Sequence, residues 1–169
     1  MADAGASIQI AKASLSDIPT INSIAKEVWP VAYRDVITAE QIEYMLERMY
    51  SSESLQQQMT VENCTFYILH DTGRPMGFAS FSEISPAVFK LHKLYVISTS
   101  QKRGYGSHLL DKIFGDITEA GGGRLQLQVN KKNSAITFYK KIGFEILEEA
   151  VFDIGHGFVM DDYIMVKEA

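Results

Sequence analysis

The chain has 169 residues, a formal net charge of −5, 46% hydrophobic residues and 22% charged residues. These ordinary values predict one globular domain over residues 1–169, and the acidic balance argues against general nucleic-acid binding, which needs a basic face. No run approaches the roughly 18 apolar residues of a membrane span, so no membrane partner is expected. The single cysteine, Cys64, excludes an internal disulfide, and the start of the chain lacks a signal-peptide pattern, so we expect a cytoplasmic protein.

The first part of the chain predicts a strand followed by helices. Residues 8–11 read as a short strand, and Ser16 is the expected N-cap of a helix with apolar side chains at helical spacing over 18–28. Residues 29–36 (WPVAYRDV) break that spacing, which predicts a loop with two exposed aromatic side chains.

Thr38 and Gln41 have the spacing of a capping box, in which Thr38 caps the second helix and the Gln41 side chain reaches back. A shorter helix is expected over 53–59. The apolar pattern then changes to a period of two, which predicts three successive strands at 64–70, 75–84 and 88–96.

A long helix is expected from Gly106, and three glycines at 121–123 end it. The order strand, helix, strand around this helix predicts a parallel pair of strands. The remaining elements are expected to be a strand at 125–129, a helix at 133–143, and two final strands at 144–152 and 163–167.

Residues 101–107 (QKRGYGS) place two glycines and two cations where the long helix is expected to begin. The first turn of a helix leaves backbone N–H groups unpaired, and glycines let an anion approach them without a Cβ in the way. The segment therefore has the ingredients of a pyrophosphate site, although a Gly-x-Gly turn is also an ordinary connector. It is not a P-loop, because no Gly-Lys-Ser/Thr follows.

The surroundings of this segment form a rarer combination of motifs: KLYV (93–96), QKRGYG (101–106), LQVN (127–130), NSAI (133–136) and FYKKIGF (138–144). This order resembles the GNAT family of acetyl-CoA-dependent N-acetyltransferases, from about residue 8 to the C-terminus. The resemblance implies an α/β (α+β) protein with the GNAT fold: a central mixed twisted sheet of about seven strands and four to five helices. In that fold the fourth and fifth strands are parallel and splay apart. Acetyl-CoA is the implied co-substrate, and no metal is expected.

The resemblance also implies which residues hold the cofactor. The backbone of Leu94, Tyr95 and Val96 would pair with the pantetheine arm, and Asn133 would contact that arm or act as a helix N-cap. The loop amides would hold the pyrophosphate, and they belong to Gln101, Lys102, Arg103, Gly104, Tyr105, Gly106 and Ser107.

Two catalytic residues follow from the same resemblance. Tyr139 matches the family tyrosine near the thioester sulfur, where it can protonate the departing thiolate, or it is packed in the core. His92 is the candidate base, on the strand face of Leu94, because its ordinary pKa near 6.5 suits proton removal. The segment LHKLYV is similar to that of serotonin N-acetyltransferase, whose matching histidine is implicated in proton removal. The alternative for His92 is a structural strand histidine.

The acceptor site is less defined by the sequence. Trp29 and Tyr33 are candidate walls of the acceptor pocket, or they cover the edge of the core. The tail FDIGHGFVMDDYIMVK resembles that of PaiA-type polyamine N-acetyltransferases, and its acids either attract a cationic amine or face water: Asp153, Asp161 and Asp162.

We therefore expect an enzyme that transfers an acetyl group from acetyl-CoA to a primary amine by direct attack in a ternary complex. A polyamine is one candidate acceptor. The alternatives are a non-catalytic acyl-CoA sensor and acetylation of a protein or peptide amine. Because members of the family are often dimers, a homodimer is also expected.

Overall fold

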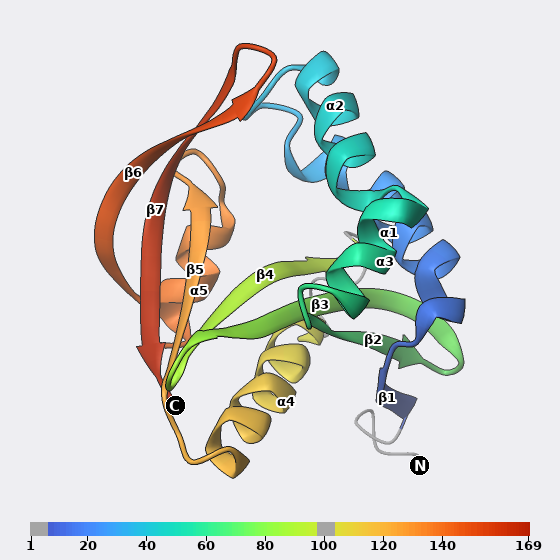
Figure 1. Cartoon of the computed structure of the whole chain (residues 1–169), viewed down its shortest axis with the longest axis vertical. Helices are drawn as coiled ribbons and strands as arrows, with labels where there is room; N and C mark the ends of the chain where they lie inside the picture. Colours follow the sequence, from blue (N-terminus) through green and yellow to red (C-terminus); the bar gives the residue numbers. More distant parts are fainter. Residues whose placement is uncertain (1–6, 98–103) are drawn as a thin grey trace.

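The computed structural model describes residues 7–97 and 104–169, and within them seven strands form one sheet in the order β1-β2-β3-β4-β5-β7-β6 (Figure 1). Only β4 and β5 pair in parallel, and the other neighbours are antiparallel. The expected mixed sheet with a parallel central pair is therefore confirmed. The strands are β1 (Ile8–Lys12), β2 (Thr65–Asp71), β3 (Arg74–Ser85), β4 (Val88–Val96), β5 (Arg124–Asn130), β6 (Glu145–Gly155) and β7 (Phe158–Glu168).

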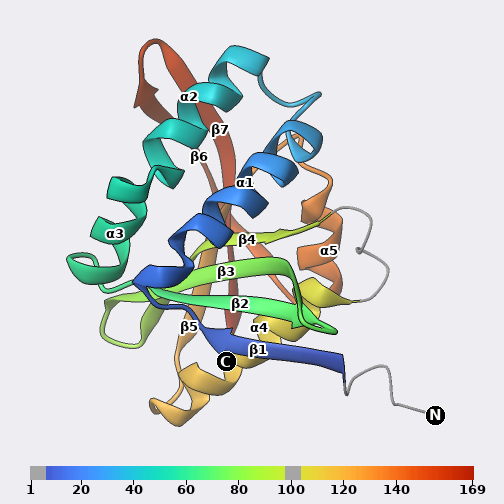
Figure 2. The same ribbon diagram turned by 90° about the vertical axis from the view of Figure 1, so that its right-hand side faces the viewer.

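Five α-helices lie on the two faces of the sheet (Figures 1 and 2). One face packs against α4 and α5, around Leu109, Ile113 and Leu127, and the other packs against the three N-terminal helices, around Ile21, Leu55 and Phe78. Among the helices of the described residues, none combines the length and hydropathy needed to cross a membrane. The helices are α1 (Ile18–Ala32), α2 (Ala39–Tyr50), α3 (Ser52–Thr60), α4 (Tyr105–Glu119) and α5 (Ala135–Lys141), and a short 3-10 turn, η2 (Leu15–Asp17), precedes α1.

The parallel strands β4 and β5 pair over only four residues and then separate. Pairing runs from Val88 to Leu91 of β4, whereas β4 continues along β3 as far as Val96. Phe81 of β3 lies opposite Leu91, and the preceding Ser80 lies opposite Lys93, so one extra residue is inserted into β4. Such a bulge bends a strand and increases its twist, which accounts for the separation of β4 from β5.

The extra residue in β4 is His92, and it changes which side chains share a face of the strand. Leu91 and Leu94 are three residues apart, yet both pack in the cluster on the α4 side. His92 instead lies within hydrogen-bonding distance of Ser82. Ser82 follows Phe78 by four residues in β3, so both lie on the face that packs against α1. The expectation that His92 and Leu94 share a face is therefore wrong, because the regular two-residue period does not survive the bulge.

Helix α1 begins and ends at different residues than expected. Asp17, not Ser16, is its N-cap, and the helix continues to Ala32 through the segment that was expected to be a loop. Trp29 and Tyr33 are buried, at 2% and 7% exposure, so the prediction of two exposed aromatics is wrong. The four-residue spacing of Ile21, Ala25, Trp29 and Tyr33 keeps these side chains on one face, and that burial outweighs the break expected over residues 29–36.

The hairpin formed by β6 and β7 reaches over to α2 at one end of the sheet (Figure 1). Thr38 Oγ1 accepts the Gln41 N–H at 3.0 Å, as the capping box predicts. The Gln41 side chain does not reach back; it donates to the Val159 carbonyl at 3.3 Å. The Tyr44 hydroxyl donates to the Ile154 carbonyl at 2.9 Å. These hydrogen bonds connect the hairpin to α2, and we call this connection the bridge.

Candidate active site

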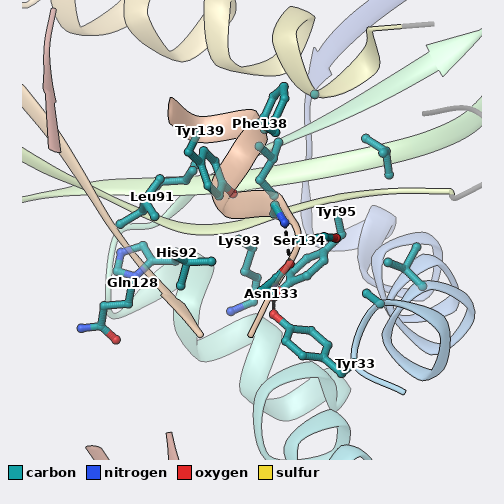
Figure 3. A pocket seen from close by; sticks show the side chains of 18 of the residues that line it. Tyr33, Leu91, His92, Lys93, Tyr95, Gln128, Asn133, Ser134, Phe138 and Tyr139 are labelled. Atoms are coloured by element: carbon teal, nitrogen blue, oxygen red, sulfur yellow. Dashed lines mark hydrogen bonds between the residues drawn. The ribbon is translucent and has the colours of Figure 1, made fainter. Parts of the chain in front are cut away.

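A cavity of about 420 Å³ lies where β4 leaves β5 (Figure 3). Its walls come from the C-terminal halves of β4 and β5, the start of α4, the turn before α5, α5 itself and the end of α1. The separation of the two strands therefore opens the space, and three helices close its sides. The labelled lining residues in Figure 3 are Tyr33, Leu91, His92, Lys93, Tyr95, Gln128, Asn133, Ser134, Phe138 and Tyr139.

Most residues predicted to hold the cofactor meet at this cavity. Leu94, Tyr95 and Val96 line it from the part of β4 that no longer pairs with β5. The backbone edge there is available to a ligand that pairs like a strand. Gly104, Gly106 and Asn133 line the cavity as well, whereas the predicted Gln101, Lys102 and Arg103 lie outside the described residues.

The start of α4 combines a special backbone conformation with open space. Gly104, the N-cap, has φ +71°, and a Cβ placed on it would meet nothing within 4 Å. A Cβ on Gly106 would lie 3.2 Å from Cζ of Phe138, so that glycine permits the approach of α5. Within the part of the chain that the structure describes, no side-chain hydrogen bond caps this helix, and its N-terminal end favours an anion.

Two predicted members of the loop contribute differently from the glycines. The Tyr105 side chain is buried, and its hydroxyl donates to Asp71, so only the Tyr105 backbone could face a ligand. Ser107 belongs to the first turn of α4 but is not among the residues that line the cavity.

Asn133 organises the turn that connects β5 to α5. Its Oδ1 atom accepts the Ala135 N–H at 2.9 Å, and its own N–H donates to the Asn130 carbonyl at 2.9 Å. The helix starts two residues later, with Ser134 as its flanking residue. Asn133 therefore has the structural role of satisfying the first helical N–H while it lines the cavity.

Tyr139 lies on α5 with 8% of its surface exposed, packed edge-on against Phe144 with ring centroids 5.5 Å apart. It also lines the cavity, so it combines the packing and the cavity positions that the sequence left open. Burial is the largest of the effects that raise the pKa of its hydroxyl above the ordinary value. The hydroxyl is therefore protonated throughout the physiological range.

His92 also lines the cavity, at the bulge in β4. Its Nε2 atom lies 2.7 Å from the Ser82 hydroxyl, which fixes the ring. Burial, and then the charges of Lys90 and Lys93, lower the pKa of His92 to about 4. The imidazole is therefore neutral at pH 7, and it holds a proton more weakly than an ordinary histidine.

The aromatic residues expected to wall the acceptor pocket differ in position. Tyr33 lines the cavity, and its hydroxyl lies 2.9 Å from that of Tyr95 (Figure 3). Trp29 does not line the cavity; its ring lies behind Tyr33 and Tyr95, with centroids at 4.4 Å and 5.6 Å. Its Nε1 donates to the Tyr50 hydroxyl at 3.3 Å, so Trp29 supports the wall from within the core.

Lys93 and Gln128 are among the cavity residues that the sequence analysis missed. Lys93 is only 5% exposed, with its ammonium group 5.1 Å above the Tyr50 ring, and burial lowers its pKa to about 8. A charged residue inside the apolar strand LHKLYV was the available signal for Lys93. Within the described residues, no three His, Cys, Asp or Glu side chains are grouped to bind a metal ion.

Comparison with known proteins identifies the family to which this arrangement belongs. Residues 33–161, more than half of the chain, match the family model of the acetyltransferase (GNAT) domain. The spermidine N(1)-acetyltransferase of Thermoplasma acidophilum is 27% identical over 145 residues, which cover 83% of this chain and 89% of that protein.

Solved structures share the fold over nearly the whole chain. The PaiA N-acetyltransferase of Thermoplasma acidophilum, in complex with coenzyme A, superposes with a TM-score of 0.81 at 25% identity and covers 96% of this chain and 99% of its own. A GCN5-related N-acetyltransferase from Rhodopseudomonas palustris has the same TM-score at 19% identity and covers 95% of both chains.

The lowered pKa of His92 predicts how the stability of the fold depends on pH. Above its ordinary pKa of 6.5 the histidine is neutral in both the folded and the unfolded chain. Between pH 6.5 and 4 only the unfolded chain takes up the proton, so stability falls as the pH falls. We expect this residue alone to cost about 2 kcal/mol between pH 7 and pH 5.

Urea unfolding of the wild type and of His92→Gln at pH 7 and pH 5 measures this contribution. Glutamine retains a polar atom near the position of Nε2, so the contact with Ser82 can persist while the titration is removed. The variant should lose about 2 kcal/mol less than the wild type on acidification. His108→Gln, at an exposed position of α4, is the matched control and should follow the wild type. Equal losses in wild type and His92→Gln would contradict the assignment.

Proposed function

The chain belongs to the GNAT acetyltransferase family and is an acetyl-CoA-dependent N-acetyltransferase, and from this premise we propose that its acceptor is a primary amine of the polyamine class. The observation that supports acetyl-CoA binding most strongly is the separation of β4 from β5 beside the start of α4. The spermidine acetyltransferase relative and the PaiA structure support the choice of acceptor class.

Two features of the cavity suit coenzyme A, the edge of β4 and the start of α4. The unpaired edge of β4 from Leu94 to Val96 offers N–H and C=O groups to the pantetheine arm. Gly104 and the N–H groups of the first turn of α4 would hold the pyrophosphate, because Gly104 has no side chain and the helix end favours negative charge. When bound, acetyl-CoA supplies an acetyl group activated as a thioester.

Tyr139 is proposed as the proton donor of the transfer. The nitrogen of the acceptor amine forms the new bond to the acetyl carbon while the bond from that carbon to sulfur breaks. The Tyr139 hydroxyl, protonated because burial raises its pKa, would donate its proton to the departing sulfur. The backbone N–H near Leu94 would stabilise the negative charge that develops on the acetyl oxygen.

His92 is proposed as the group that receives the proton lost by the amine. It lines the cavity and is neutral at pH 7, so it has a nitrogen lone pair available. Its pKa of about 4 lies far below the roughly 10 of an alkylammonium group, so the proton must pass on to water at once. His92 would therefore pass the proton on to water and would not retain it.

The proposed activity is tested by the release of coenzyme A thiol from acetyl-CoA in the presence of different amines. The panel comprises spermidine, spermine, aminoglycosides, amino acids and lysine peptides. We expect amine-dependent release that is fastest with the polyamines. Release that is fastest with a lysine peptide would overturn the acceptor class, and acetyl-CoA binding without any amine-dependent release would favour a cofactor sensor.

The substitution Gly104→Glu should reduce acetyl-CoA affinity by at least a hundredfold in calorimetry. A carboxylate would occupy the open space at the start of α4 and repel the pyrophosphate. Gly121→Glu is the matched control, because Gly121 lies just past the other end of α4, also has a positive φ, and also has open space around its Cβ. The control should bind acetyl-CoA normally, whereas unchanged affinity in Gly104→Glu would remove the pyrophosphate from this helix end.

The substitution Tyr139→Phe should lower kcat by roughly a hundredfold, which is typical for the loss of a general acid, and should leave the affinity for acetyl-CoA nearly unchanged. The phenylalanine ring preserves the packing against Phe144. Tyr163→Phe serves as the control, because Tyr163 packs on the same core cluster but does not line the cavity. Wild-type turnover in Tyr139→Phe would show that Tyr139 is a packing residue only.

A further inference from the structure

The three aspartates of the β6–β7 hairpin have different surroundings. Asp153 is exposed, and its Oδ1 accepts the Gly155 N–H at 2.9 Å within the hairpin. Asp161 is exposed and forms an ion pair with Lys131 at 3.0 Å. Asp162 is buried, with 4% of its surface exposed. Asp153 and Asp161 are therefore ordinary hairpin acids that face water, whereas the burial of Asp162 requires a further explanation.

The Asp162 carboxyl carries an oxygen atom without a partner. Its Oδ1 is fully buried and has no hydrogen-bond partner among the described residues. Asp71, the other buried aspartate of the described chain, instead accepts hydrogen bonds from the hydroxyls of Ser7, Thr72 and Tyr105. An unsatisfied buried carboxylate oxygen costs folding stability, so its presence indicates a role in binding.

Asp162 is not among the residues that line the cavity, but it lies next to them in the sheet. Tyr163 and Met165 of β7 pack toward α4 and α5, so Asp162 points to the opposite side, toward α1 and α2. It lies opposite Asn130, the residue that follows cavity-lining Val129 in β5. Its charge also acts on Tyr33, whose pKa is raised mainly by burial and further by Asp162.

No cation of the described protein neutralises Asp162 directly. Lys90 attracts it, yet the ion pairs found in the described residues do not include an ion pair within 4.0 Å between them. Burial, and then the charge of Asp161, raise the pKa of Asp162 to about 6, while Lys90 opposes the shift. The carboxyl is therefore mostly ionised at pH 7 and lacks a counter-charge at bonding distance.

We propose that Oδ1 of Asp162 binds a second, non-reacting ammonium group of the acceptor, so that the enzyme selects diamines and polyamines over monoamines. This inference rests on the proposed amine acetyltransferase activity. The reacting nitrogen must be neutral when it attacks, and a carboxylate stabilises the charged form of any amine beside it. Asp162 therefore assists the reaction only when it binds a different nitrogen of the same acceptor.

The bridge between the β6–β7 hairpin and α2 supports this arrangement. Gln41 and Tyr44 bind the hairpin by hydrogen bonds to the carbonyls of Val159 and Ile154, which hold the strand that carries Asp162 over the α1 and α2 side. Lys93 and His92 line the cavity from β4, whereas Asp162 is a buried acidic group on β7. An extended cation with two separated nitrogens matches that distribution of charge.

The decisive experiment compares diaminobutane with butylamine, which has the same carbon chain but lacks the second nitrogen. The wild type should use the diamine with a kcat/KM at least tenfold higher than that of the monoamine. Asp162→Asn, which removes the charge and preserves the shape, should lower kcat/KM for the diamine to about the value for butylamine, mainly through KM. The KM for acetyl-CoA should stay within twofold.

Asp161→Asn is the matched control, because it removes the same charge from the adjacent residue while Asp161 faces outward toward Lys131. It should keep the wild-type preference for the diamine. A preserved preference in Asp162→Asn would overturn the proposal, as would an equal loss in Asp161→Asn. The melting temperature checks folding, and Asp162→Asn should melt no lower than the wild type, because it removes an unpaired buried charge.

Failure of the proposed activity and failure of this inference have different signatures. If no amine is acetylated, calorimetric titration of diaminobutane into the coenzyme A complex still reports on Asp162. Weaker diamine binding by Asp162→Asn, with normal binding by Asp161→Asn, would then support the ammonium site in the absence of turnover. Equal diamine affinity in the wild type and both variants would overturn it.

Discussion

The insertion of one residue, His92, into β4 determines where every other part of the active site lies. Up to Leu91 the strand pairs with β5, and beyond the bulge it follows only β3. The backbone groups released on this edge would be costly if they stayed unpaired in a protein interior. The start of α4 and the turn before α5 both border the resulting space, so a single irregularity in the sheet brings two helices and one strand edge to the same cavity.

The same irregularity gathers ionisable groups in an environment that disfavours their charged forms. His92 and Lys93 follow one another at the bulge, and burial lowers the pKa of both. Across the cavity burial raises the pKa of Tyr139, and on the acceptor side it raises the pKa of Asp162. A neutral imidazole, a protonated phenol and an ionised carboxylate then coexist at pH 7, and these are the states on which the proposed mechanism depends.

Residues with a local chemical requirement were predictable from the sequence. Gly104 needs a positive φ at the start of a helix, Asn133 needs a short polar side chain in a turn, and Tyr139 lies at a fixed spacing within a helix. Such requirements produce recognisable sequence motifs, and these motifs predicted the fold and several of the residues that line the cavity. The mixed sheet with parallel fourth and fifth strands followed from the same resemblance.

Features that arise from tertiary contacts were not predictable in this way. The bulge cannot be read from the sequence LHKLYV, because it is defined by the pairing of β4 with β3. Only that pairing shows that one residue of β4 has no partner in β3. The C-terminal end of α1 extends past Pro30 because Trp29 and Tyr33 find a core to pack in. Asp161 and Asp162 are chemically identical in the sequence, and only the pairing of β7 with β5 and β6 exposes one and buries the other.

The bridge between α2 and the β6–β7 hairpin also has a consequence for how new acceptor preferences can evolve. Gln41, Tyr44 and Arg48 donate hydrogen bonds to main-chain carbonyls of the hairpin, at Val159 and Ile154. Every residue type carries such a carbonyl, so side chains along the hairpin can be exchanged without breaking the three bonds that hold it. Related enzymes can therefore vary exposed side chains of this strand pair while these main-chain hydrogen bonds keep its position beside α2.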